Sequence, residues 1–526
     1  MNRLPIIAIT LCLFASNTVA QLPKTYQLNS GRGSSLSLSN SVSDIIVQHD
    51  SVWFGTERGL SMTTNNGTSW IHFSGTGTFN EQGNKGISAI AVKDNVIWVA
   101  TGYTTKLGDE EVQTGGGLHF STDHGVTWSF ISQPVDQGTI DTLSYGSKNK
   151  IRALAITVPQ QNITFDIALT KNTVWTASWA GMLRKSRLDS LNFVPVILPP
   201  DSDSLASIDT TMALNFAFDL SPSAGRLGLT ENDNHKVFSV YASNDTIIWV
   251  GTAGGINKST DGGMSWRKFS HHNQNHAISG NFVVALKEQI LPTRRILWAA
   301  TVNANDPDET KGVSYSENGG ETWKTTLLGE WAHNFDFKDS LVYVATDNGL
   351  FRSSNFGESW IRSGSIYDPD PTKLHRFVSP ECYGVGVKGD TVWCAGPEGI
   401  AYTIDSPSQT FGSIWKIFRT YEPIENEKRT YAYPNPFAPD DEPTRLHFSL
   451  GTNHIGSQEV SIRIFDYAMQ PVRTIIQKAS RLNGNEYDEI WDGKNDNRSM
   501  LANGVYFYLV EITDQAPIWG KILVLK

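Results

Sequence analysis

Short runs of alternating apolar and polar residues recur along the chain, and Asp, Asn or Gly interrupts each of them. Typical runs are "ISAIAVK" (87–93), "FSVYAS" (238–243) and "YGVGVKG" (383–389). Apolar residues at every second position predict β-strands, and the interrupting residues predict turns. The pattern therefore predicts an all-β chain of short antiparallel strands.

An aromatic strand followed by a glycine turn recurs seven times, as in "DTIIWVGTAGGINKSTD" (245–261). Aligned on the aromatic residue, the seven anchors are Trp53, Trp98, Trp175, Trp249, Trp298, Tyr343 and Trp393. Each unit reads as four short strands, which cannot bury both faces of their sheet alone. Arranged radially, each sheet packs on the next one, so the repeat predicts a seven-bladed β-propeller.

A second repeat lies between the last two predicted strands of most units. Its copies are "TTNNGTSW" (63–70), "STDHGVTW" (121–128), "STDGGMSW" (259–266), "SENGGETW" (316–323) and "SSNFGESW" (353–360). Asp or Asn can accept backbone N–H bonds across the turn, Gly supplies positive φ, and Trp buries a large area against the preceding hairpin. We assign structural roles to Asn65, Trp70, Asp123, Trp128, Asp261, Trp266, Asn318, Trp323, Asn355 and Trp360.

These strings resemble the Asp-box (BNR) repeat, S-x-D-x-G-x-T-W, of sialidase-like propellers. Asn replaces Asp in three of the five, and the third unit (186–193) and the seventh (403–415) are degenerate. The resemblance implies that the boxes lie on the face opposite the ligand site. It specifies the fold rather than the activity, because one fold serves many functions.

A Pro-rich and charged stretch, 419–431, marks a linker, and a new alternating pattern follows it. The strings "YPNPF" (433–437), "IFDYAMQPV" (464–472), "WDGKNDN" (491–497), "NGVYFYLV" (503–510) and "GKILVLK" (520–526) resemble the FlgD-type Ig-like module. They also resemble the type A sorting domain of the type IX secretion system. The predicted organisation is a signal peptide (1–20), the propeller (21–418), the linker (419–431) and a small Ig-like β-sandwich (432–526).

The first twenty residues carry one Arg, an apolar run and small residues up to Ala20, which is typical of a secretory signal peptide. We therefore expect an exported protein, extracellular or on the outer-membrane surface, with the periplasm as the alternative. No later stretch reaches the roughly 18 to 20 apolar residues of a transmembrane helix. The formal net charge of −10 disfavours a nucleic-acid partner, which requires a basic surface.

Catalytic signatures of the related enzymes are missing from the sequence. No Phe/Tyr-Arg-Ile-Pro string, arginine triad or tyrosine nucleophile of a sialidase can be located, and Asp-box xyloglucan hydrolases place their acid and base on two facing propellers. We therefore interpret the chain as a binding protein for a glycan or a surface protein, whose C-terminal module engages the type IX secretion machinery. The alternatives are a glycoside hydrolase or lyase, and an extracytoplasmic sensor or assembly platform.

The long insertions fall between the second and third strands of a unit or between units: 74–85, 102–115, 131–160, 194–235, 268–279, 303–310 and 362–380. All of these loops emerge on one face of a propeller, which we call the insertion face, and long loops on a rigid scaffold often carry function. The opposite face, with the boxes, is the box face. Trp179, in a turn of the third unit, is the candidate aromatic platform for a ligand, or else packs between blades.

Three further groups are candidates for chemistry. Acidic loops could gather Ca²⁺, or carry only solvated charge; their residues are Asp109, Asp306, Asp308, Asp368 and Asp370. His271, His272 and His276 could hold a transition metal, although their spacing matches no known ligand motif and favours a solvated loop; no cofactor is otherwise implied. Cys382 and Cys394 flank a turn, so that a cross-strand disulfide and two buried thiols both remain open.

Overall fold

The computed structural model describes residues 24–27, 30–32, 38–73, 85–108, 110–138, 142–220, 229–304, 306–370, 376–419, 430–440, 442–450, 457–482, 486–513, 515 and 517–525. Strands dominate them, and helix is confined to two short 3-10 turns, η1 (Asp203–Leu205) and η3 (Asp233–His235). The all-β prediction is confirmed. No helix in these ranges has the length and apolarity that crossing a membrane requires.

Seven sheets between residues 42 and 418 share one plan of four consecutive strands, each antiparallel to its neighbours. The first three comprise β3 (Val42–Gln48), β4 (Ser51–Thr56), β5 (Gly59–Thr63) and β6 (Ile71–Phe73); β7 (Gly86–Lys93), β8 (Val96–Leu107), β9 (Glu110–Ser121) and β10 (Thr127–Ile131); and β13 (Thr164–Leu169), β14 (Thr173–Ser178), β15 (Met182–Arg187) and β16 (Val194–Pro195). The next two comprise β20 (Val237–Ala242), β21 (Ile248–Thr252), β22 (Gly255–Ser259) and β23 (Trp266–Phe269); and β24 (Phe282–Ile290), β25 (Arg295–Val302), β26 (Gly312–Ser316) and β27 (Lys324–Thr326). The last two comprise β28 (Ala332–Lys338), β29 (Leu341–Thr346), β30 (Gly349–Ser353) and β31 (Ile361–Arg362); and β32 (Gly384–Lys388), β33 (Thr391–Gly396), β34 (Gly399–Ile404) and β35 (Trp415–Phe418).

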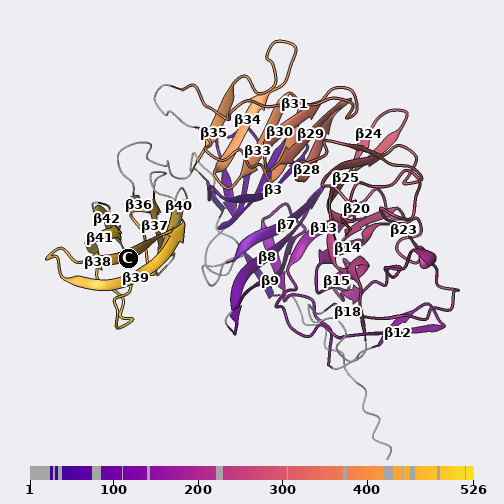
Figure 1. Ribbon diagram of the computed structural model, residues 1–526, viewed down its shortest axis with the longest axis horizontal. Helices are drawn as coiled ribbons and strands as arrows, with labels where there is room; N and C mark the ends of the chain where they lie inside the picture. Colours follow the sequence, from indigo (N-terminus) through magenta and orange to yellow (C-terminus); the bar gives the residue numbers. More distant parts are fainter. Residues whose placement is uncertain are drawn as a thin grey trace, which may run out of the picture.

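The first strands of these sheets contact one another in a closed cycle. β3, β7, β13, β20, β24, β28 and β32 each contact the next strand in this order, and β32 contacts β3 again. Lys388 crosses this last junction, where its Nζ donates to the carbonyl oxygens of Asp50 and Thr64, both at 2.7 Å. The ring is a β-propeller, with these inner strands around its axis (Figure 1).

The aromatic anchors explain why the sheets pack on one another. All seven lie in the second strand of a sheet, and none is more than 2% exposed. An aromatic side chain of this kind removes about 150–250 Å² from water. The repeat of one buried aromatic residue per unit therefore places one large apolar group in every sheet.

The boxes close the last hairpin of their sheets through one hydrogen-bond pattern. In the fourth sheet Asp261 Oδ1 accepts from Ser259 Oγ (2.8 Å) and from the Ser265 N–H (2.9 Å), and the Gly263 N–H donates to Ser259 Oγ (2.8 Å). Gly263 has φ of 82°, and a Cβ there would lie 2.5 Å from the ring of Trp175 in the preceding sheet. Trp266 packs edge-on against the same ring, at 6.3 Å. The box tryptophan thus joins two sheets, beyond the single hairpin that the sequence suggested.

Two long insertions expected to be loops, 131–160 and 194–235, instead contribute an additional sheet. It consists of β11 (Thr142–Tyr145), β12 (Asn149–Ala153), β18 (Ala217–Asp219) and β19 (Thr230–Glu231), with parallel pairing from β12 to β19. Ile151 and Phe218 of this sheet join the core of the third and fourth sheets. The insertion 102–115 likewise continues the hairpin of β8 and β9. Short strands add to outer edges elsewhere: β1 (Lys24–Gln27) to β10, β2 (Ser30–Arg32) to β6, and β17 (Ser207–Ile208) to β23.

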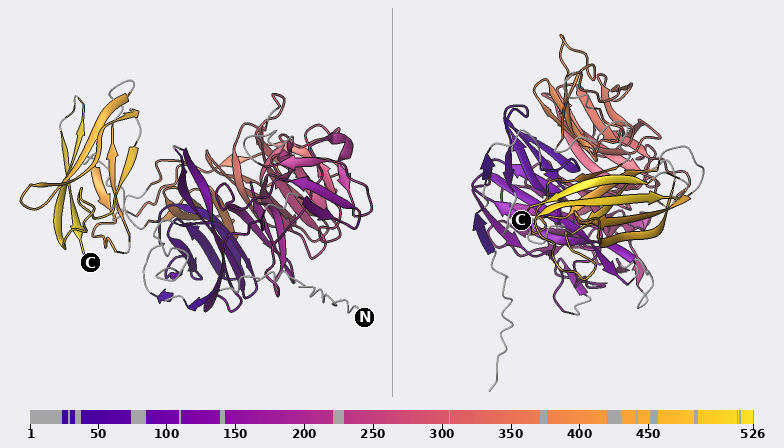
Figure 2. Two further views of the ribbon diagram at one scale, coloured as in Figure 1. Left: turned by 90° about the horizontal axis from the view of Figure 1, so that it is seen from below. Right: turned by 90° about the vertical axis from the view of Figure 1, so that its left-hand side faces the viewer.

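The C-terminal part forms two sheets around a core of its own. One sheet contains β36 (Thr430–Tyr433), β37 (Thr444–Ser449) and β40 (Glu486–Trp491); the other contains β38 (Ser457–Phe465), β39 (Pro471–Leu482), β41 (Gly504–Ile512) and β42 (Ile518–Val524). Their shared core draws only on residues 432–524. The three-stranded sheet lies nearer the propeller (Figures 1 and 2), and Arg445 on β37 pairs with Glu57 in the turn between β4 and β5 at 3.2 Å.

Candidate functional site

The inner strands carry a bulge at the end that opens on the insertion face. Register shifts occur within the first four residues of the inner strand in six sheets: Val42/Asp44, Ile87/Ala89, Thr164/Asp166, Val237/Ser239, Val283/Ala285 and Ala332/Asn334. In the seventh sheet the Tyr383 N–H donates to Ala395 O, although Ala395 already pairs with Gly384. A bulge re-aims the extra side chain. We call this end of the ring the mouth; the bulged residues there are Ser43, Ser88, Phe165, Phe238, Val284, His333 and Tyr383.

Aromatic side chains form one arc of the mouth. The Phe165 and Phe238 ring centroids lie 5.3 Å apart, and those of Phe238 and Phe282 lie 4.4 Å apart. All three side chains are half-buried. This arc offers a ligand apolar ring surface and contains no charge.

The sixth sheet supplies an acid and an imidazole beside this arc. His333 Nε2 lies 2.6 Å from Asp347 Oδ1, and the Asp347 N–H donates to Trp331 O (3.2 Å). The Trp331 ring lies nearly parallel to the His333 ring, with centroids 6.4 Å apart. The turn between β29 and β30 thus fixes the carboxylate, and the bulge of β28 directs the imidazole towards it.

The seventh sheet adds a tyrosine and a second carboxylate. The Tyr383 hydroxyl donates to Glu381 Oε2 (3.0 Å), and the Tyr383 ring packs edge-on against His333 at 5.3 Å. Burial, followed by the hydrogen bond to Glu381, raises the pKa of Tyr383 to about 12. The phenol is therefore neutral and donates at ordinary pH.

Together these residues form the mouth cluster: Glu330, Trp331, His333, Asp347, Glu381 and Tyr383. Glu330 Oε2 accepts from Asn348 Nδ2 (2.7 Å) in the same turn as Asp347. Within the described ranges, none of the three carboxylates pairs with a Lys or Arg. The cluster combines ring faces with hydrogen-bond acceptors, which suits a polyhydroxylated ligand or a polar side chain.

The sequence reasoning missed the mouth cluster. The segments "GEWAHNF" (329–335) and "SPECYG" (379–384) contain no catalytic or ligand motif. A signal does exist: when the starts of the seven inner strands are aligned, His333 and Tyr383 stand at one repeat position, where other units have Ser, Phe or Val. A ring or imidazole at that position marks a departure from the repeat.

Carboxylates deeper in the ring join neighbouring inner strands. Asp166 Oδ1 accepts from the Ile167 N–H (2.8 Å), and its Oδ2 accepts from the Val240 N–H of the next sheet (2.9 Å). Burial raises the pKa of Asp166 to about 7 and that of Asp44 to about 6. Lys287 Nζ, whose charge opposes both shifts, pairs with Asp336 at 2.9 Å. These acids therefore hold the scaffold beneath the mouth.

Trp179 lies on the expected face but already has a partner. Its ring lies 5.8 Å from Lys236 Nζ, and Lys236 in turn pairs with Asp233 (2.9 Å) at the entry to β20. The side chain is half-buried. Both interpretations of Trp179 stay open, since the pair joins neighbouring sheets and leaves part of the ring exposed.

The acidic candidates do not converge on one place. Asp368 is only 3% exposed, its Oδ1 accepts from the Asp370 N–H (3.1 Å), and its Oδ2 accepts from the Ile417 N–H of β35 (3.2 Å). Asp306 Oδ1 accepts from the Asp308 N–H (2.8 Å) in a different loop. Asp109 lies outside the described residues. The arrangement assigns Asp368 to anchoring its own loop.

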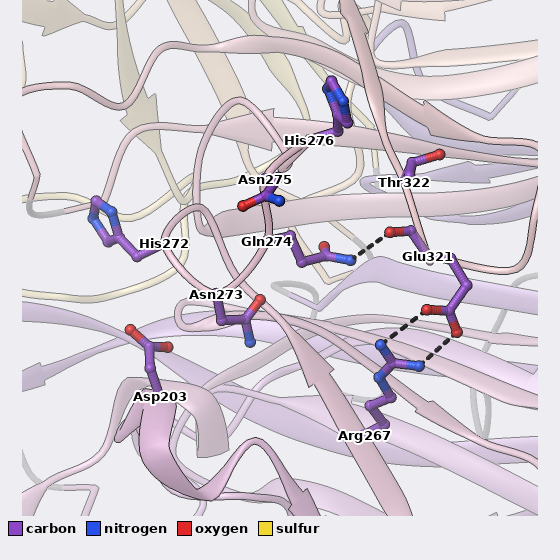
Figure 3. Close-up of a pocket in the computed structure, with 9 residues that line it drawn as sticks. All are labelled: Asp203, Arg267, His272, Asn273, Gln274, Asn275, His276, Glu321 and Thr322. Atoms are coloured by element: carbon purple, nitrogen blue, oxygen red, sulfur yellow. Dashed lines mark hydrogen bonds and ion pairs between the residues drawn. The ribbon is translucent and has the colours of Figure 1, made fainter.

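Two of the three histidines lie together, with the His271 and His272 ring centroids 5.0 Å apart. His271 bonds the Ile278 carbonyl oxygen (2.7 Å), and His272 Nε2 lies 2.9 Å from Asp306 Oδ2. His276 points away from His272 (Figure 3). No group of three His, Cys, Asp or Glu side chains in the described part of the chain could hold a metal ion. A transition metal held by two of these imidazoles and a neighbouring acid therefore stays a prediction.

A polar pocket of about 610 Å³ lies beside these histidines, at the outer rim between the fourth and fifth sheets (Figure 3). Arg267 forms a double ion pair with Glu321, at 2.5 and 3.0 Å. Gln274 Nε2 donates to the backbone oxygens of Gly320 and Glu321. Arg267, Glu321 and the Gln274 amide nitrogen thus join the two sheets, and in the described part of the chain the mouth carboxylates have no Lys or Arg partner.

The cysteines Cys382 and Cys394 are free thiols in this structure, and both are fully buried. They belong to one core cluster beside the sixth and seventh sheets.

No protein-family model matches the chain. A curated relative, the xyloglucanase of Hypocrea jecorina (strain QM6a), is 25% identical over 322 residues, which cover 57% of this chain and 35% of the relative. The chain thus spans about a third of the length of the curated relative that it matches.

Solved structures with a similar trace include PorZ, a surface component of the type-IX secretion system of Porphyromonas gingivalis: 13% identity, TM-score 0.40, covering 92% of this chain and 66% of that one. YCF48 from Cyanidioschyzon merolae shows 16% identity and a TM-score of 0.41, covering 71% of this chain and 98% of that one. An ancestral GH74 enzyme shows 15% identity and a TM-score of 0.46, covering 95% and 63%. At these identities the likeness concerns the fold alone.

Proposed function

We propose that the chain is an exported, surface-associated binding protein that holds a glycan or protein ligand at the mouth of a seven-bladed Asp-box propeller. The mouth cluster carries this proposal. There the repeat is interrupted by Trp331, His333 and Tyr383, and carboxylates that pair with no described Lys or Arg stand beside these half-buried rings. Such a surface stacks on sugar rings and accepts hydrogen bonds from hydroxyl groups.

In this proposal the two ends of the chain direct its export. In this proposal residues 1–20 are the signal peptide that carries the chain across the inner membrane. The C-terminal part is an Ig-like module of FlgD or type A sorting type, which engages the type IX secretion machinery. Its separate core supports treating it as a module apart from the propeller.

Binding is favoured over catalysis because the reactive groups of the cluster are occupied with one another. The Tyr383 phenol stays neutral beside Glu381, so it is a poor nucleophile. Among the described residues, no Ser or Cys hydrogen-bonds to His333. The cluster is therefore better suited to holding a ligand than to attacking it.

Glycoside hydrolysis is the second candidate, and two observations favour it. The curated relative is a xyloglucanase, and two of the three mouth-cluster carboxylates, Asp347 and Glu381, belong to adjacent sheets. A pair of carboxylates on either side of a glycosidic bond is the usual arrangement for its hydrolysis.

One experiment separates the two candidates. The full chain is incubated with immobilised xyloglucan, other polysaccharides and sialoglycans, and retained protein and released reducing ends are recorded together. We expect retention without release, and loss of retention in the Asp347→Asn/Glu381→Gln double variant. Asp306→Asn, an acid outside the cluster, is the matched control and should be retained. Release that disappears in the double variant would establish hydrolysis, and retention that ignores the double variant would contradict the assigned site.

A further inference from the structure

The segment that carries half of the mouth cluster also carries a cysteine. Cys382 stands between Glu381 and Tyr383, and its N–H donates to Thr346 O (2.9 Å), one residue before Asp347. The position of this backbone segment, 381–383, therefore sets the positions of the Glu381 carboxylate and the Tyr383 ring relative to Asp347.

The second cysteine lies in the strand that supports this segment. A Cβ on Gly396 in β33 would lie 3.5 Å from Cys382 Cα and 2.3 Å from Glu381 O, so the segment crosses β33 in direct contact. Cys394 is two residues from Gly396 and shares its face of the strand, because side chains alternate along a strand. Glycine at 396 is what allows this approach.

The two thiols meet inside the protein. Both are 0% exposed and lie in one core cluster. Burial, followed by a hydrogen bond with the Cys382 thiol, raises the pKa of Cys394 well above its usual value. A protonated, buried thiol reacts slowly. Any reaction between these cysteines must therefore precede the closure of the seventh sheet.

We propose that Cys382 and Cys394 are joined by a disulfide during folding, and that this bond fixes segment 381–383, with Glu381 and Tyr383, to β33. The S–S bond forms as each thiol gives up its hydrogen. The two electrons and two protons pass to an oxidant of the disulfide class, a thiol oxidoreductase or oxidised glutathione, which is reduced to two thiols. The consequence for ligand binding rests on the proposed function, but the bond itself does not.

The test uses the full chain and requires neither a ligand nor export. The protein is unfolded, refolded in a mixture of oxidised and reduced glutathione, denatured, alkylated with iodoacetamide and mapped by mass spectrometry. We expect one peptide pair that links Cys382 to Cys394 and is two hydrogens lighter than the reduced pair. Alkylation of both cysteines in protein that has regained its thermal transition would overturn the proposal.

A second readout tests the fixing of the segment. Wild type unfolded and refolded in dithiothreitol should melt several degrees below wild type refolded with glutathione and should exchange amides faster in 379–384, while exchange in the box 316–323 stays unchanged. Dithiothreitol should leave the Cys382→Ser/Cys394→Ser variant, the matched control, unaffected. If that variant does not fold, the wild type alone decides: equal exchange rates in 379–384 after refolding with glutathione and after refolding in dithiothreitol contradict the fixing role.

Discussion

At the box face, Asp261 accepts hydrogen bonds from the side chain and backbone of its own hairpin, and the same geometry recurs at Asn318 with little change. At the insertion face, His333 and Tyr383 occupy one repeat position in neighbouring sheets, yet they differ in chemistry from their counterparts Ser43 and Val284. The Asp or Asn of each box is engaged by its own hairpin, whereas Glu330, Asp347 and Glu381 at the other end pair with no Lys or Arg among the described residues. This contrast supports the proposal that the box face maintains the ring and that the insertion face receives the ligand.

The largest expected effect on stability comes from the box face. Asp261→Ala removes an acceptor for the Ser259 hydroxyl and for the Met264 and Ser265 N–H groups, so we expect a loss of about 2–3 kcal/mol in the free energy of unfolding. Chemical denaturation measures this loss. Polysaccharide retention below the transition should stay as in the wild type, and reduced retention there would give the box a role in binding.

At the mouth we expect the opposite result, a loss of ligand affinity with little loss of stability. The Asp347→Asn/Glu381→Gln variant should lose about tenfold in affinity, or about 1.4 kcal/mol, because it removes the charged acceptors while keeping the side-chain volumes. Its free energy of unfolding should stay within about 1 kcal/mol of the wild type, since the cluster lies at the surface. Equal losses in stability and in affinity would remove the contrast between the two faces.

The next effect concerns the pH dependence of stability, which we expect from the inner strands beneath the mouth. The folded-state pKa of Asp166 is raised to about 7, so between pH 4 and pH 7 the folded chain binds a proton that the unfolded chain has released. Wild-type stability should therefore fall as pH rises through this window. Asp166→Asn should reduce the difference in the free energy of unfolding between pH 5 and pH 8 by about 1–2 kcal/mol. Urea titrations at pH 5 and pH 8 measure the slope, and an unchanged slope would show that Asp166 ionises normally.

The smallest expected effect is a gain at a box that has Asn. Asn318→Asp restores the carboxylate found at Asp123 and Asp261, whose acceptor bonds are charge-assisted, so we expect about 0.5 kcal/mol of added stability. Thermal unfolding at low and high salt measures it. A loss at low salt that high salt relieves would mean that repulsion from Glu317 and Glu321 outweighs the stronger bonds.

The propeller could be predicted because its signal is local and repeated. An anchor such as Trp249 or Trp298, followed by its glycine turn, indicates a strand in each unit. The four-stranded units could therefore be predicted from the pattern. The additional sheet could not be predicted, because β12 pairs with β18 across more than sixty residues without a repeat to indicate it. The mouth cluster could not be predicted either, because no repeat indicates which residues meet there. A bulge re-aims His333, and Tyr383 meets it only through the packing of two sheets, whereas Trp179, which stood out in the sequence, is already engaged with Lys236.

Hydrogen exchange with and without a bound polysaccharide, chosen as one that retains the chain, tests the central claim most directly. The account predicts slowed exchange in 329–335, 346–349 and 379–384 at the mouth, and unchanged exchange in the boxes 259–266 and 316–323. Protection concentrated in the boxes, with the mouth segments unchanged, would contradict it.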